Sequence, residues 1–178
     1  FNKKKVNYMK KKYRIKLNTI YKKLKQKNNF FVHRDFHVSN LMYYKKKICI
    51  IDSQDALYGN AAYDLASLVD DVRIKTSKDL KNKILSFYLN KCDKKIQLNL
   101  KEFIHDFNIL SVQRNLKILG IFARLFKRDK KNMYLKLLPY TWKLLDLRMK
   151  NNKYFNNIYR ELSKDIPNRI KNKRFNEN

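Results

Sequence analysis

The stretch HRDFHVSNLMYYKKKICIIDSQDA, residues 33–56, decides how the rest of this chain is interpreted. Four of its polar residues are of the types that handle phosphate and metal ions: His33, Asp35, Asn40 and Asp52. Phosphoryl transfer to a hydroxyl needs a carboxylate that orients the hydroxyl and accepts its proton, and oxygen ligands for magnesium. A loop of the form H-x-D-x-x-x-x-N supplies the carboxylate and one ligand. The stretch therefore predicts half of a phosphoryl-transfer site.

Two short apolar runs, LMYY and ICII, follow Asn40 and are joined by the lysines at positions 45–47. Apolar runs joined by a polar turn are typical of a β-hairpin, although this turn lacks the preferred Asn-Gly or Asp-Gly. The hairpin would return the chain so that Asp52, at the end of a buried strand, lies beside Asn40. A carboxylate buried at a strand end needs a partner.

Most of the remaining sequence predicts helices. Residues 1–29 carry apolar positions three and four apart, which predicts one or two amphipathic helices with a basic outer face, and residues 30–32 are expected as a short strand or loop entry. Later helices are expected within 57–73, after a loop that contains Gly59, then after a cap at Thr76 or Ser77 with apolar positions up to Leu89. Further helices are expected over 100–128 with an interruption near Gly120, over 133–149 with a kink or division at Pro139, and over 152–163. The expected fold is α+β and predominantly α-helical.

Composition limits the class of protein. A length of 178 residues corresponds to about one domain, and 44% hydrophobic residues suffice for a buried core. The net charge of +28 has two explanations, AT-rich codon usage or binding of an anionic partner. Lysine outnumbers arginine, which favours codon usage and makes nucleic acid an unexpected partner.

Neither a membrane span nor a signal peptide is evident, and Cys49 and Cys92 indicate neither a metal site nor a disulfide framework.

The motif HRDFHVSN is similar to the catalytic loop of the protein-kinase-like superfamily. The longer stretches FVHRDFHVSNLM, IIDSQDALYGNAAYDLASLVDD and LGIFARLFKRD resemble the aminoglycoside phosphotransferase family. Within that family they are most similar to bacterial kinases that phosphorylate the anomeric hydroxyl of N-acetylmuramate or N-acetylglucosamine. The resemblance implies a kinase-like carboxy-terminal lobe, ATP and Mg²⁺ as cofactors, a sugar substrate of cell-wall recycling, and a cytoplasmic protein without a membrane partner.

The resemblance also implies roles for single residues. Asp35 would be the catalytic base, and Asn40 and Asp52 would bind magnesium and, through it, the nucleotide. His33 would brace the catalytic loop against the metal-binding turn. Asp64, at a helix start, would stabilise that helix end and the loop.

Two further residues have open interpretations at this point. His37 lies where many protein kinases have a lysine that contacts phosphate, so it would contact the γ-phosphate or the sugar, or else be a solvated loop histidine. Asp55 would face sugar hydroxyls or cap the turn before Gly59. Ser53 replaces an aromatic residue that is common in the family, which removes a packing group from the metal-binding turn.

The sequence lacks the superfamily's nucleotide lobe. That lobe needs a glycine-containing phosphate loop and a strand lysine, whereas this chain has only Gly59 and Gly120, and about 30 residues precede the catalytic loop. The chain starts at Phe1 rather than Met, so a fragment is expected. The expected organisation is one domain over 1–178, with a catalytic loop (33–40), a metal-binding turn (52–55) and a helical bundle (61–163). The missing lobe would be its partner, and the chain alone would be inactive.

A binding protein is the alternative to an enzyme. In that hypothesis the lobe is catalytically degenerate and its basic surface binds nucleic acid or anionic surfaces. The intact set of Asp35, Asn40 and Asp52 favours the enzyme. Asp70 and Asp71 are expected at the solvated end of a helix rather than in a second metal site, and Trp142 with Tyr140 is expected in the core rather than in a sugar platform.

Overall fold

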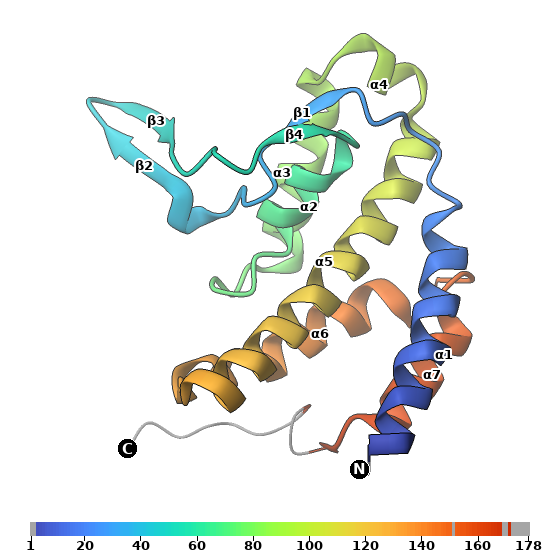
Figure 1. Cartoon of the computed structure of the whole chain (residues 1–178). Coiled ribbons are helices and arrows are strands. Elements are labelled where there is room, and N and C mark those ends of the chain that lie inside the picture. Colours follow the sequence, from blue (N-terminus) through green and yellow to red (C-terminus); the bar gives the residue numbers. More distant parts are fainter. Residues whose placement is uncertain (1–2, 151, 169–170, 172–178) are drawn as a thin grey trace.

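The computed structural model describes residues 3–150, 152–168 and 171, apart from the side chain of Lys95. Helices dominate this part of the chain, as the sequence predicts (Figure 1). The helices are α1 (Lys3–Tyr21), η1 (Val38–Asn40), α2 (Ala62–Val69), α3 (Lys78–Lys91), α4 (Lys94–Leu98), α5 (Leu100–Asp129), η2 (Asn132–Leu137), α6 (Leu138–Met149) and α7 (Asn156–Asp165). The strands are β1 (Phe30–Val32), β2 (Leu41–Tyr44), β3 (Lys47–Ile50) and β4 (Leu57–Gly59).

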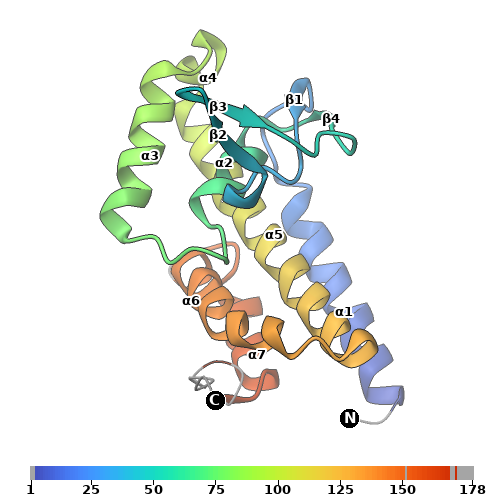
Figure 2. The same cartoon turned by 90° about the vertical axis from the view of Figure 1, so that its left-hand side faces the viewer.

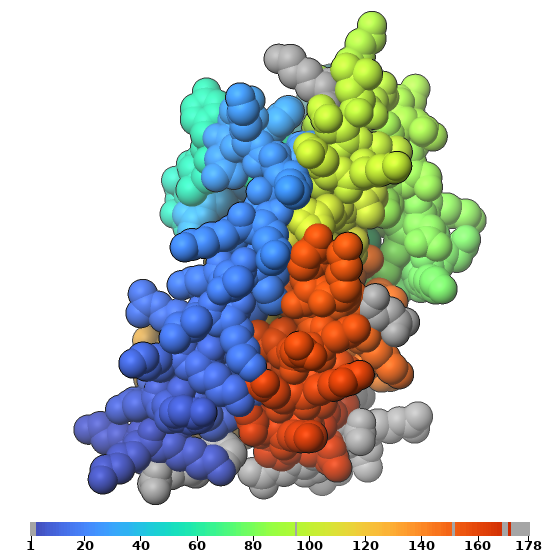
Figure 3. Space-filling view, turned by 90° about the vertical axis from the view of Figure 1, so that its right-hand side faces the viewer, coloured from blue at the N-terminus to red at the C-terminus, as the bar shows by residue number. Residues whose placement is uncertain are grey.

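The long helix α5 is the axis on which the other elements are arranged. Helix α2 packs against it, as does α6, and α1 lies alongside α7 at the far side of the molecule (Figures 1 and 3). Both pairs of strands lie towards the N-terminal half of α5 (Figures 1 and 2). The 33–40 loop and the 52–55 turn are therefore held at one end of a helical body.

Three apolar clusters make up the core. One joins α1 to α5, α6 and α7, a second joins α2 to α3, α4 and α5, and a third joins α5 to η2 and α6. Trp142 is buried in the first cluster and stacks on Tyr159, which confirms that it packs in the core. Burial of these side chains is the main source of favourable free energy for the fold.

The predicted hairpin is present, but its strands are not buried. β2 pairs antiparallel with β3, and Lys45 and Lys46 form the turn with positive φ angles of 46° and 61°. The hairpin projects from the helical body (Figure 1), and all four residues of β3 are exposed. The expectation that Asp52 ends a buried strand is therefore wrong, because no other described element covers either strand.

Helix boundaries agree with the sequence in some places and differ in others. The Ser77 hydroxyl accepts a 3.1 Å hydrogen bond from the Leu80 N–H and caps α3, and Pro139 lies in the first turn of α6, dividing it from η2. The expected interruption at Gly120 is wrong: α5 continues through it, since an isolated glycine costs a helix only about 1 kcal/mol. In the described residues, no helix combines the length and the apolar character needed to cross a membrane.

Candidate active site

The 33–40 loop is fixed to the helical body through Asp64. This carboxylate, in the first turn of α2, accepts the backbone N–H of His33 at 2.6 Å and that of Arg34 at 3.0 Å. Burial raises the pKa of Asp64, and the two N–H donors oppose that rise. Arg34 has a φ angle of 72°, which is a left-handed conformation. The two hydrogen bonds to Asp64 help to hold it. Asp64 therefore ties the start of the loop to α2.

His33 connects the same loop to the turn that carries Asp52. Its side chain is buried, and Nε2 lies 2.9 Å from the carbonyl oxygen of Ile51. A carbonyl oxygen only accepts, so Nε2 carries the hydrogen of this bond. The buried imidazole thus acts as a bridge between the two loops.

Asn40 joins Asp35 to Asp52. Its side-chain Nδ2 donates to the Asp35 carbonyl oxygen at 3.0 Å and to Asp52 Oδ2 at 3.3 Å, and its own carbonyl oxygen accepts the Ile51 N–H at 3.1 Å. Asp52 has a φ angle of 68°, and its Oδ1 accepts a 2.7 Å bond from Gln54 Nε2. The turn is strained at Asp52 and held by amide donors on both carboxylate oxygens.

These atoms fit a magnesium ion. The Asp52 carboxylate is exposed, and the Asn40 amide nitrogen points to protein acceptors, which leaves the Asn40 amide oxygen as its ligand atom. Mg²⁺ is commonly bound by one or two protein oxygens together with waters and substrate phosphates. Among the described residues, no three His, Cys, Asp or Glu side chains form a cluster suited to a metal.

His37 is buried, so the interpretation as a solvated loop histidine is wrong. Its backbone N–H donates to the Asp35 carbonyl oxygen at 3.0 Å, and its ring Nδ1 has no hydrogen-bond partner among the described residues. Burial lowers its pKa, and the nearby positive charge of Arg73 lowers it further. The lowered pKa favours the uncharged form of the ring.

Asp70 and Asp71 are buried, which overturns the expectation of a solvated helix end. Asp71 accepts the Val38 N–H of the loop at 3.2 Å and forms an ion pair with Arg73 at 3.2 Å. Asp70 is held by Lys81 and by Arg148 at the end of α6. The sequence pattern does not show this burial, because Val38 and Arg148 come from segments that only the fold brings to these carboxylates.

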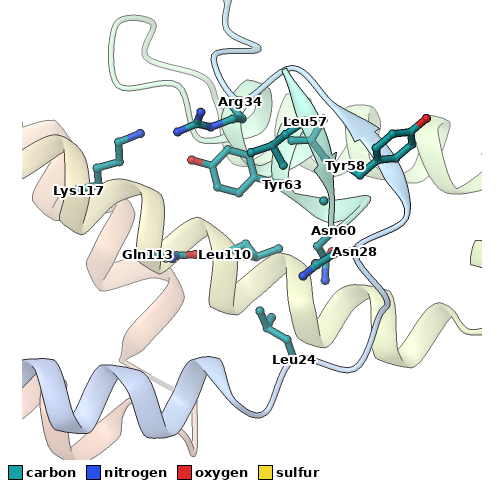
Figure 4. A pocket seen from close by; sticks show the side chains of 12 residues that line it. Leu24, Asn28, Arg34, Leu57, Tyr58, Asn60, Tyr63, Leu110, Gln113 and Lys117 are labelled. Atoms are coloured by element: carbon teal, nitrogen blue, oxygen red, sulfur yellow. The ribbon is translucent and has the colours of Figure 1, made fainter. Parts of the chain in front are cut away.

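A cavity of about 510 Å³ opens beside the loop (Figure 4). Arg34 comes from the loop, Tyr63 from α2, and Gln113 and Lys117 from α5. Apolar side chains form much of the remaining wall: Leu24, Val32, Leu57 and Leu110. Its size lies in the range of small-molecule sites, roughly 300–1,000 Å³.

Comparison with known proteins now bears on this geometry. The family model described as "Phosphotransferase enzyme family" matches residues 12–94, which include the whole loop, the hairpin and the Asp52 turn. The resemblance to the aminoglycoside phosphotransferase family is thereby confirmed. The matched residues include the site and both sheets.

Several curated proteins that are similar to this chain are named N-acetylmuramate/N-acetylglucosamine kinase. The protein of Neisseria meningitidis is 39% identical over 112 residues, which are 61% of this chain and 34% of that protein. The proteins of Caulobacter vibrioides and Pseudomonas aeruginosa are both 33% identical, over 66% and 65% of this chain and 33% and 35% of their own lengths. The chain thus spans about a third of the length of these relatives.

The fold brings most of the predicted site residues together and leaves one apart. Hydrogen bonds connect the segments of His33, Asp35, Asn40 and Asp52. Asp55 is exposed, and the structure connects it to the loop only through its carbonyl oxygen, which accepts a 3.2 Å bond from Arg34 Nη1. Sequence reasoning missed the cavity residues on α5. Gln113 and Lys117 lie one turn apart, but Ser111, Arg114 and Asn115 in the same stretch are also polar, so the sequence does not single the pair out.

Proposed function

We propose that this chain forms the catalytic half of an ATP-dependent kinase that transfers the γ-phosphoryl group to a hydroxyl of an amino sugar. One observation carries the proposal: the Asn40 amide nitrogen donates to both the Asp35 carbonyl and the Asp52 carboxylate, so base and metal ligands belong to one bonded unit. The names of the similar curated proteins support an amino sugar as the acceptor.

The proposed roles follow from the chemistry of phosphoryl transfer. Asp35 orients the sugar hydroxyl and accepts its proton as the oxygen forms a bond to phosphorus, and the bond between that phosphorus and the ADP oxygen breaks. Asn40 and Asp52 hold the magnesium, which when bound neutralises charge on the phosphates. His33 and Asp64 keep these groups in register through the bonds described above. His37 contacts the sugar or the γ-phosphate, and Asp55 faces sugar hydroxyls.

A nucleotide-binding lobe would complete the site. Neither glycine of this chain lies in a phosphate-binding loop, since Gly59 is in β4 and Gly120 is inside α5. The hairpin exposes large apolar side chains beside the proposed metal site, among them Tyr43 at 72% and Ile48 at 62%. Exposed apolar surface of this kind is typical of a docking face. We place the lobe there as the proposed partner.

The test is phosphorylation of N-acetylglucosamine or N-acetylmuramate by ATP. In a protein that carries both lobes, Asp35→Asn is expected to lower kcat by 100-fold or more, the scale of a lost general base, while nucleotide affinity changes little. Asp79→Asn, which changes an exposed carboxylate in the first turn of α3 outside the loop and the cavity, is the matched control and should leave both unchanged. The 178-residue chain alone is expected to show no turnover. Undiminished turnover in Asp35→Asn would remove Asp35 from the role of base.

A further inference from the structure

The cavity beside the loop has a positively charged end. Arg34, Lys117 and Tyr63 direct their polar groups to the same end of the cavity in Figure 4, whereas Leu24 and Leu110 line another part of the wall. The carboxylates of the catalytic loop and the metal-binding turn, those of Asp35, Asp52 and Asp55, do not line it. A small ligand held here would meet two cations, one phenol and an apolar wall.

This end of the cavity adjoins the proposed base. Arg34 precedes Asp35 in the chain, and Asp64, which follows Tyr63, accepts the Arg34 N–H at 3.0 Å, so both cavity residues lie next to anchored positions of the catalytic loop. A molecule whose hydroxyl reaches Asp35 can therefore extend past Tyr63 into the cavity. The cavity would hold a part of the acceptor remote from the reacting hydroxyl.

The similar proteins are named for two sugars, which differ at one group that a cation can recognise. N-acetylmuramate carries a carboxylate, and N-acetylglucosamine does not. Guanidinium and ammonium groups are the side chains that bind carboxylates with charge-assisted hydrogen bonds. An apolar wall suits the ring face and the methyl group that both sugars share.

We propose that this cavity is a subsite for the carboxylate of an acidic amino sugar, with Lys117 and Arg34 as its two cationic contacts. The inference rests on the proposed function, because the role of Asp35 as base fixes which end of the sugar lies at the loop. It adds a preference among acceptors: the anionic sugar should bind better than the neutral one. Lys117 then determines specificity and takes no part in proton transfer.

Binding of the two sugars by the 178-residue chain tests the subsite without any phosphoryl transfer. Titration of the chain with N-acetylmuramate and N-acetylglucosamine, followed by NMR or calorimetry, gives a ratio of two Kd values. We expect the chain to bind N-acetylmuramate more tightly. Lys117→Met should reduce that preference about three- to fivefold, the range of a solvent-exposed ion pair, and leave Kd for N-acetylglucosamine unchanged. Lys117→Arg should restore the preference.

The control is Lys143→Met, which removes one charge from the exposed face of α6 outside the cavity and should leave the ratio unchanged. If Lys143→Met lowers the preference as much as Lys117→Met does, general attraction by the +28 charge explains it and the subsite is wrong. The absence of any preference for N-acetylmuramate in the unchanged chain overturns it too. If the protein that carries both lobes shows no turnover while the 178-residue chain keeps its preference for N-acetylmuramate, the proposed function is wrong and the subsite stands.

Discussion

At the scale of single residues, the most constrained group is Asp70, not one of the loop carboxylates. It is fully buried and receives bonds from Lys81 Nζ at 3.0 Å and from Arg148 Nε at 2.8 Å, and the Ser111 hydroxyl donates to it as well. Burial alone raises its pKa, but the charge of Arg148 and these bonds outweigh burial, so the pKa lies below its ordinary value. Asp70 therefore holds α2, α3, α5 and α6 together as a charged centre.

Asp70→Asn is expected to lower the free energy of unfolding by about 3–5 kcal/mol, because it leaves Lys81 and Arg148 buried without their counter-charge. Urea unfolding at pH 7 measures this loss. A carboxyl whose pKa is lowered by folding adds stability above its unfolded pKa, and that stability is lost as the pH falls through the folded pKa. The variant should therefore lose less stability than the unchanged chain below about pH 4.

Asp79→Asn is the matched control for this prediction. Asp79 pairs with Lys83 at 2.9 Å, but both side chains are more than 70% exposed. Exposed pairs of this spacing contribute about 0.3–0.5 kcal/mol. Equal losses in the two variants would show that burial of the Asp70 network adds nothing to its contribution.

At the scale of elements, the sequence predicts which segments form helices and strands but not what covers them. The cap at Ser77, the division at Pro139 and the hairpin follow from local patterns and are present. The exposure of the hairpin does not follow, because an apolar run looks the same whether or not another element covers it. The burial of Asp70 and Asp71 could not be predicted either, since Arg148 lies 78 residues from Asp70. At the site, the loop motif indicates the residues of the proposed base and ligands. The cavity could not be predicted, because its wall forms only when α2 packs against α5.

Gly120→Ala is expected to stabilise the chain by about 0.5–1 kcal/mol. Gly120 lies inside α5, and a Cβ at this position would meet no atom within 4 Å. Alanine therefore gains helix propensity and reduces the entropy of the unfolded chain without strain. Gly59→Ala is the contrast, since its Cβ would lie 3.0 Å from Val32 Cγ2 in the β1–β4 pair. It should be neutral or destabilising in urea unfolding. A destabilised Gly120→Ala would contradict the helical account.

At the scale of the whole molecule, two electrostatic effects of opposite sign compete. The net charge of +28 repels itself in the compact state, which destabilises the fold, while local pairs such as Lys12 with Glu161 attract across α1 and α7. Salt weakens both, since the Debye length falls from about 30 Å at 0.01 M to about 8 Å at 0.15 M. Long-range repulsion is therefore screened more completely than contacts a few ångströms apart.

The urea midpoint of the chain is accordingly expected to rise between about 0.01 M and 0.15 M NaCl, because the repulsion lost exceeds the attraction lost. NaCl and KCl should give equal increases, since screening depends on ionic strength and not on the cation.

The same experiment separates general screening from a bound anion. Sodium N-acetylmuramate should raise the midpoint beyond NaCl at equal ionic strength if it occupies the Lys117 cavity, because a ligand that binds only the folded state stabilises it. A midpoint that falls with NaCl would show that local ion pairs, not the net charge, dominate the electrostatics of this fold.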